Sequence, residues 1–296
     1  MYLHRLLLSS FFATATVATL HAGTKPAAAP EDSAPPSLAA APSSLITGDI
    51  GITLANEYNT RGVIVQDQGV TFQPYLNLSA KFYEGQGLIQ SASLLFGLWA
   101  DVSSNGNVSG PGNPGGKFTE FDYGGGLSVS FAKRWTFSTF LNSWTSPADG
   151  YGDGQWINGT LSFNDDGLLA EHFSIKPYLL VLRDLGGDAA TGLERSAWYF
   201  EPGIRPNYTF FADTATPLNV ALLVKAGLGS EFYAGKSVGY VAAGPQLSVP
   251  LAFVDPSLGK WTASTGYLYY RLAETLKPSG DDRNESLFTF NLNVNF

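Results

Sequence analysis

The last ten residues of the chain, 287–296, read Leu-Phe-Thr-Phe-Asn-Leu-Asn-Val-Asn-Phe. From Phe288 onward every second residue is apolar, and the residues between are Thr or Asn. Because side chains alternate between the two faces of a β-strand, this spacing predicts a strand with one apolar and one polar face. The segment therefore indicates a sheet that separates an apolar environment from a polar one.

The same alternation recurs upstream along nearly the whole chain. We expect twelve strands, at 46–58, 70–82, 89–102, 118–132, 134–144, 155–164, 172–184, 197–210, 217–229, 238–252, 260–272 and 286–296. The apolar face of these strands carries only two charged residues, Arg183 and Arg271, both near predicted strand ends. The polar face carries Gly, Ser, Thr and Asn together with charged residues.

Charge is scarce in this chain, yet the mean hydropathy is close to zero. Only 14% of the 296 residues are charged, against about 25% in ordinary soluble domains. A Lys or Arg on the lipid face of a barrel costs roughly 2–4 kcal/mol at the bilayer midplane, so a bilayer selects an uncharged face. We therefore predict an all-β fold, a transmembrane antiparallel up-and-down β-barrel of about twelve strands.

Composition also excludes several functions. The absence of Cys excludes a disulfide scaffold and a thiolate metal site, and the net charge of −8 argues against nucleic-acid binding. The spacing of His172 and Ser174 resembles that of outer-membrane phospholipases, but it falls at a predicted periplasmic turn. Asp149 and Asp153 lack the calcium-loop pattern. We expect no enzyme activity, no catalytic residue, no metal and no cofactor.

The connections between predicted strands alternate between longer and shorter segments, as in barrels with long outer loops and short periplasmic turns. An even number of strands leaves both termini in the periplasm. The main difficulty is a set of five prolines that fall inside predicted strands, where each removes a ladder hydrogen bond. These residues are Pro74, Pro177, Pro202, Pro206 and Pro245.

The chain ends predict export to a Gram-negative outer membrane. Residues 1–22 have the positive start, apolar stretch and small-residue end of a signal peptide. Residues 23–45 form an Ala/Pro-rich segment expected to be a periplasmic tail, and the barrel is expected over 46–296. The terminal Phe296 resembles the last residue of outer-membrane barrels, which implies the barrel-assembly machinery and outer-membrane lipid as partners.

The stretch that follows the first predicted strand resembles the opening motif of the TorF family of porin-like outer-membrane proteins. Asn56-Glu57-Tyr58 and Arg61-Gly62 match that motif, while Thr60 stands where the family has an aromatic residue. The match covers under a tenth of the chain. The resemblance implies an outer-membrane barrel with porin activity, and it carries over no catalytic residue.

The charged residues on the polar face are the candidates for lining a pore. They are Glu57, Lys81, Asp101, Glu120, Asp122, Glu201, Arg205 and Lys225. The predicted outer connections hold more acidic than basic side chains, with Arg61 counted among the bases, and an acidic mouth concentrates cations. We expect passive diffusion of small hydrophilic solutes with a weak cation preference.

Two other readings of the sequence remain open. Opposite charges inside a narrow barrel normally pair, which would give a structural or adhesive outer-membrane barrel with a closed lumen. A secreted soluble β-sandwich that binds carbohydrate would also show short alternating strands and many aromatic residues.

Overall fold

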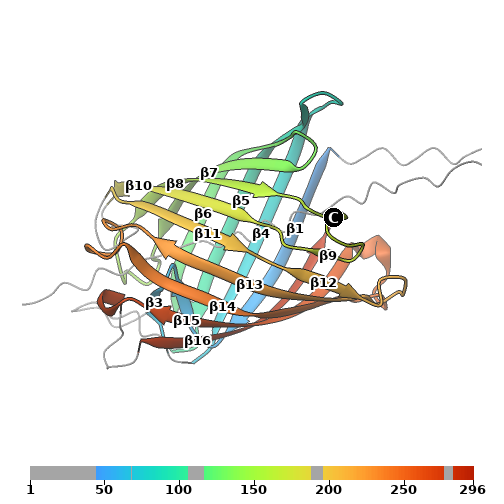
Figure 1. The fold of residues 1–296 in the computed structure, drawn as a ribbon. Coiled ribbons are helices and arrows are strands. Elements are labelled where there is room, and N and C mark those ends of the chain that lie inside the picture. The colour runs from blue at the N-terminus through green and yellow to red at the C-terminus, as the bar shows by residue number, and fades with distance from the viewer. Residues whose placement is uncertain (1–44, 68, 106–116, 188–195, 277–282) are drawn as a thin grey trace, which may run out of the picture.

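The computed structural model describes residues 45–67, 69–105, 117–187, 196–276 and 283–296. These residues form one closed antiparallel barrel (Figure 1). The sheet has fourteen segments, but two wall strands are each broken into two pieces, so the wall has twelve strands. The predicted fold class is confirmed. The expected signal peptide and all but the last residue of the expected tail lie outside the described residues.

The wall strands follow one another around the barrel in chain order. They are β1 Ile46–Ala55, β4 Thr71–Glu84, β5 Ile89–Ser103, β6 Phe118–Phe131, β7 Trp135–Thr145, β8 Gly154–Phe163, β9 Phe173–Ser174 with β10 Tyr178–Gly187, β11 Trp198–Ile204 with β12 Asn207–Phe210, β13 Leu218–Leu228, β14 Val238–Pro250, β15 Lys260–Leu272 and β16 Asn284–Asn295. The first and last strands close the wall, with Ile50 opposite Val294 and Leu54 opposite Phe290.

The apolar face predicted from the sequence is the exterior of the barrel. Along β5, for example, Leu94 and Phe96 are 55% and 44% exposed, whereas Trp99 and Asp101 on the other face are buried. Such an exterior would be unfavourable in water and suits a lipid environment. The alternative of a soluble β-sandwich is therefore wrong, because one sheet closes on itself and presents its apolar side outward.

Aromatic side chains mark both rims of this exterior. Near the end that carries the longer connections, Trp198 stacks on Phe200 and Tyr267 packs on Phe288. Near the opposite end, Trp135 packs on Phe163 and Tyr208 on Phe210. Paired aromatic girdles of this kind lie at the two membrane–water interfaces of outer-membrane barrels. We therefore call the two ends of the barrel outer and inner, with both wall termini, Ile46 and Asn295, at the inner end.

The two exterior arginines differ in position. Arg271 is next to last in β15, as expected, but Arg183 lies inside β10, which runs on to Gly187. The Arg183 guanidinium carbon lies 5.1 Å from the centre of the Trp198 ring, so its charge is stabilised by a cation–π interaction.

The five prolines are accommodated in two ways. Pro177 and Pro206 lie in the breaks that divide β9 from β10 and β11 from β12. Pro74, Pro202 and Pro245 stay inside strands and point outward. Each is paired with one neighbouring strand and sits at a gap in the register with the other, so the missing N–H leaves only one ladder incomplete.

The first outer connection does not extend away from the barrel. The predicted strand 46–58 ends at Ala55, and the chain then forms a short hairpin from β2 Tyr58–Thr60 and β3 Val63–Gln66. Most of this hairpin is buried, which places it inside the barrel, and the sequence reading of 59–69 as an outer loop is wrong. Two short 3₁₀ turns, η1 Pro256–Leu258 and η2 Glu274–Leu276, complete the described elements. Within the described ranges, no helix has the length and apolar character needed to cross a bilayer.

Candidate functional site

Asn56 turns the chain from the wall into the lumen. Its side-chain Nδ2 donates to the carbonyl of Ser286 at 2.8 Å, and its Oδ1 accepts from the amide of Phe288 at 2.7 Å. These two bonds pair the Ser286 carbonyl and the Phe288 amide of β16, which a further residue of β1 would otherwise have paired. The Asn56 amide also donates to the Phe288 carbonyl at 3.3 Å, so the main chain leaves the ladder after Asn56 while β16 keeps its hydrogen bonds.

The tip of the hairpin is a two-residue turn formed by Arg61 and Gly62. Both residues have positive φ, 49° and 80°, as the tight turns that match strand twist require. The carbonyl of Arg61 accepts a hydrogen bond of 2.9 Å from the hydroxyl of Tyr233. A Cβ on Gly62 would lie 2.7 Å from the ring of Tyr240, so the turn sits flush against the far wall.

The side chain of Arg61 lies inside the barrel and is only 4% exposed. Its guanidinium carbon lies 5.1 Å from the ring centre of Trp156 and 5.6 Å from that of Tyr199. Delocalised charge over aromatic faces is a favourable arrangement for a buried guanidinium. Arg61 therefore does not belong to the outer rim, where the sequence analysis counted it.

Three of the predicted pore-lining acids lie together on β5 and β6, opposite the hairpin. Glu120 Oε2 accepts hydrogen bonds from the hydroxyls of Tyr58, at 3.1 Å, and Tyr151, at 2.5 Å. Asp122 accepts from Asn142 Nδ2 at 3.0 Å and interacts electrostatically with Arg61. Asp101, the third acid, accepts from Gln73 and Thr119. We call Asp101, Glu120 and Asp122 the acidic wall.

Glu57 faces the lumen, as predicted, but from the hairpin segment rather than from a wall strand. It is 4% exposed, and Asn59 Nδ2 donates to its carboxyl at 3.4 Å. Burial, with the nearby carboxylates of Glu285 and Asp67, raises the pKa of Glu57 to about 7 against the weaker opposing effect of Asn59. This carboxyl lies outside the spanning strands and changes charge near neutral pH.

Glu201 and Lys225 form a second buried group on the opposite side of the lumen. Lys225 Nζ lies 3.4 Å from Glu201 Oε2, and both side chains are almost fully buried. The hydroxyls of Tyr178, Tyr199 and Tyr240 donate to the Glu201 carboxylate at 2.8, 2.5 and 2.5 Å. Such a paired and hydrogen-bonded charge is stable in a packed interior. Loss of one partner would leave the other as a buried, unpaired charge.

The two remaining candidates lie elsewhere. Lys81 lies near the inner end of β4 and forms an ion pair of 2.6 Å with Glu84. Arg205 lies in the break between β11 and β12 and is half-buried, with its backbone amide bonded to Ile175. The structure thus brings Glu57, Asp101, Glu120, Asp122, Glu201 and Lys225 into the outer half of the lumen, and it places Lys81 near the inner end of β4 and Arg205 at the β11–β12 break.

An aromatic cluster fills the outer half of the lumen, and the sequence analysis missed it. Trp144, Trp156, Tyr199, Tyr233 and Tyr240 are all at most 1% exposed and pack with one another and with neighbouring apolar side chains. Four of these five lie at inward positions of the predicted strands. The alternation along each strand could therefore have predicted that these aromatic side chains point into the lumen. We expected a Gly-, Ser- and Asn-rich interior throughout, and that expectation is wrong for this half.

The inner half of the lumen is different. Its inward positions are mostly small and polar and only half-buried, for example Asn77, Ser93, Thr160, Asn219 and Ser264. The lumen therefore has an inner half lined by partly exposed polar side chains, which we call the inner vestibule, and a closed outer half.

The side chains of Ser174 and His172, singled out in the sequence, contact different residues. Ser174 accepts a hydrogen bond from Asn207, while the His172 ring packs edge-on against Tyr208. Across the described ranges, no group of three or more His, Asp or Glu side chains is placed to hold a metal ion.

Comparison with known proteins identifies the fold. No family model and no curated protein matches the chain. Among solved structures, the chain is similar to a bacterial polysaccharide outer membrane secretin, with TM-score 0.50, 8% identity and coverage of 85% of this chain and 98% of that one. It is also similar to the COG4313 outer membrane channel from Pseudomonas putida F1 (TM-score 0.47, 11% identity, 90% and 100%) and to LpxR from Salmonella typhimurium (0.46, 11%, 83% and 99%).

Identities this low show a shared fold and nothing about activity. The resemblance to the TorF family stays a prediction, although its matching residues Asn56, Glu57, Tyr58, Arg61 and Gly62 all lie in the inward hairpin segment. The chain has the fold of bacterial outer-membrane β-barrels, in agreement with the predicted location.

Proposed function

We propose that this protein is an outer-membrane channel for small hydrophilic solutes whose lumen is closed at rest by the β2–β3 hairpin. The observation that carries the proposal is that the hairpin forms a sheet of its own, paired with no wall strand. It is held inside by side-chain contacts and by the Tyr233–Arg61 bond, so it can leave without breaking the barrel ladder. The inner vestibule, lined by partly exposed polar side chains, would form the other half of the path.

The charges that the hairpin would leave behind favour cations. With Arg61 withdrawn, the acidic wall would face the lumen, while Glu201 and Lys225 would still neutralise each other. Rings of acidic side chains are a common basis of cation preference in pores. This arrangement supports the weak cation preference expected from the sequence and assigns it to the wall rather than to the rim.

Planar-bilayer recording tests the proposal. The wild type is compared with a variant in which residues 57–67 are replaced by a short Gly-Ser linker. A control variant replaces the exposed residues 234–236 of another outer loop in the same way. We expect brief openings in the wild type and the control, sustained conductance in the hairpin variant, and a reversal potential that favours cations in a salt gradient. The absence of conductance above bare lipid in all three proteins would refute the channel.

Selectivity has its own test in the hairpin variant. We expect Glu120→Gln with Asp122→Asn to move the reversal potential toward zero, because two carboxylates leave the exposed wall. Lys81→Gln, at the inner end, is expected to have a much smaller effect. An unchanged reversal potential in the double variant would show that these two acids do not cause the cation preference.

A structural barrel with a permanently closed lumen is the second candidate. The observation that favours it is the aromatic cluster, whose members come mainly from the wall and would remain after the hairpin left. A hairpin variant that folds and inserts but never conducts would support this candidate.

We also propose that the β16 end guides assembly. The main chain of Phe296 exchanges two 3.0 Å hydrogen bonds with Gly48, which closes the seam of the barrel at its inner end. Contact of this strand with the barrel-assembly machinery would precede seam closure. Phe296→Ala is expected to lower the fraction of inserted protein. If the full-length Phe296→Ala variant inserts to the same fraction as the wild type, the assignment is contradicted.

A further inference from the structure

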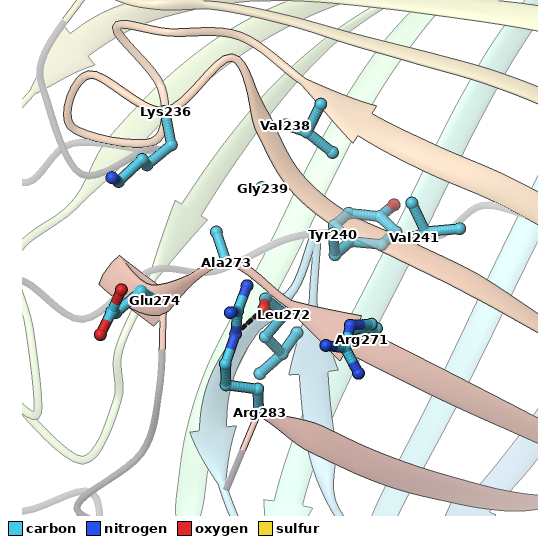
Figure 2. A pocket seen from close by; sticks show the side chains of 10 residues that line it. All are labelled: Lys236, Val238, Gly239, Tyr240, Val241, Arg271, Leu272, Ala273, Glu274 and Arg283. Atoms are coloured by element: carbon cyan, nitrogen blue, oxygen red, sulfur yellow. Dashed lines mark hydrogen bonds between the residues drawn. The ribbon is translucent and has the colours of Figure 1, made fainter. Parts of the chain in front are cut away.

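A cavity of about 300 Å³ lies at the outer rim, where β14 begins and β15 ends. Gly239, Leu272 and Ala273 are among the residues that line it, and the Ala273 amide donates a 2.6 Å hydrogen bond to the Gly239 carbonyl. Figure 2 shows the side chains around it. Tyr240 and Leu272, which belong to the buried cluster in the lumen, also line the cavity.

Three cationic side chains surround this cavity: Lys236, Arg271 and Arg283. They come from three different segments, namely the β13–β14 loop, β15 and the residue before β16 (Figure 2). Within the described part of the chain, none of the three makes an ion pair, and Glu274 is the one acid among the lining residues. The cavity therefore has an excess of positive charge.

The Arg283 side chain is anchored by a hydrogen bond to the main chain of β15. Its Nε donates to the carbonyl of Leu272 at 3.0 Å (Figure 2), which leaves the other guanidinium N–H groups for a ligand. Guanidinium groups bind phosphate through two parallel hydrogen bonds, and a Lys adds a point charge. The chemistry of the cavity fits a phosphate group.

The surface below the cavity is apolar and faces lipid. Val238 and Val241, which line the cavity, are each 48% exposed on the exterior, and Tyr269 and Phe288 continue the same face toward the membrane. A ligand with a phosphate above and hydrocarbon chains below would satisfy both surfaces at once. A free phosphate would use only the first.

We propose that this cavity binds the phosphorylated headgroup of a lipid in the outer leaflet. The lipid's phosphate binds Arg283, Lys236 and Arg271 add positive charge on either side of it, and the acyl chains lie along the Val241 face. The site rests on the barrel and its orientation and does not depend on whether the lumen conducts.

The test uses the full chain in detergent micelles and lipid A as the probe. Binding of lipid A with both phosphates, of the same lipid without phosphate, and of inorganic phosphate is measured by native mass spectrometry. The outer double variant is Lys236→Gln with Arg271→Gln. Its matched control is Lys133→Gln with Lys260→Gln, which removes the same charge from exposed positions at the inner end.

We expect the outer double variant to weaken binding of phosphorylated lipid A by about tenfold or more, because two positive charges that flank the phosphate are lost. The inner control should change it less than about twofold. Arg283→Lys should give an intermediate loss, since it keeps the charge but not the fork. Unchanged heat-modifiable gel mobility verifies that each variant is folded.

Three results would overturn the proposal. Equal losses in the outer and inner variants would show general charge attraction to the micelle. Equal binding of the lipid without phosphate would remove the role of the headgroup. Competition by inorganic phosphate at the same concentration as lipid A would assign the cavity to a soluble anion.

Discussion

Glu57 is a residue whose charge changes near neutral pH. Its pKa is about 7 in the closed lumen against an ordinary value of 4.5. Because the docked hairpin favours the protonated carboxyl, docking is most stable at low pH and loses stability as the pH rises from about 4.5 to about 7. The full effect is at most about 3 kcal/mol.

We therefore expect the hairpin amides of 58–66 to be better protected from hydrogen exchange at pH 5 than at pH 8, by up to roughly a hundredfold after correction for intrinsic rates. Glu57→Gln should make this protection independent of pH. The exposed loop variant Glu231→Gln serves as the control and should keep the wild-type profile. A pH dependence that survives in Glu57→Gln would place the titrating group elsewhere.

Asn56 offers a second test at the scale of one side chain. Asn56→Ala removes both bonds to β16 and should lower the free energy of unfolding by about 1 kcal/mol, because these bonds are partly exposed. Asn56→Asp keeps the acceptor for Phe288 and should cost less. Urea titrations in detergent, with Gln86→Ala in the inner β4–β5 turn as control, measure both. Equal costs for Ala and Asp would contradict the two-bond arrangement.

At the scale of elements, the hairpin depends on Gly62 for two separate reasons. The residue has φ of 80°, and its missing Cβ leaves room for the Tyr240 ring. Gly235 has a similar φ of 88° but has no atom within 4 Å of its virtual Cβ. The two glycines thus separate backbone strain from steric contact.

Gly62→Ala is expected to displace the hairpin and raise the open time of the channel, whereas Gly235→Ala should cost only about 1 kcal/mol of backbone strain and leave gating unchanged. Bilayer recording and hydrogen exchange of residues 58–66 give the two readouts. Equal behaviour of the two variants would mean that contact with Tyr240 does not hold the hairpin.

The wall strands could be predicted closely, and the exceptions have local causes. Strand parity is correct along β5, where Phe96 faces outward and Asp101 inward, because alternation is a property of each strand alone. The breaks at Pro177 and Pro206 were signalled by residue type. Residue type did not indicate the pairing gaps at Pro74 and Pro202. These gaps depend on which of the two neighbouring strands lacks a hydrogen bond from the proline.

At the scale of the whole molecule, the barrel has an apolar exterior and a polar or packed interior at every height. Phe96→Arg, near the middle of β5 on the exterior, should therefore lower stability in a bilayer by roughly 2–4 kcal/mol. Ser93→Arg, which points into the inner vestibule, should cost much less. Unfolding in liposomes measures both changes, and similar costs for the two would contradict the assigned lipid face.

The candidate site was only partly predictable. Asp101, Glu120 and Asp122 were identified as lumen-facing from parity, and the structure places them together. The inward course of Asn56 to Gln66 was not foreseen, and so Arg61 was assigned to the wrong compartment. Arg61 meets Trp156 and Tyr199 only because segments far apart in sequence converge inside the barrel.

The sequence by itself determined the transmembrane barrel, its strand number and the direction in which each wall side chain points. These follow from a two-residue period that operates within single strands and from the high cost of charge in lipid. Tertiary structure alone decided that the outer lumen is closed and that three cations surround one cavity at the rim. Both depend on contacts between distant segments, such as Gly62 with Tyr240 and Arg283 with Leu272, which no local period encodes.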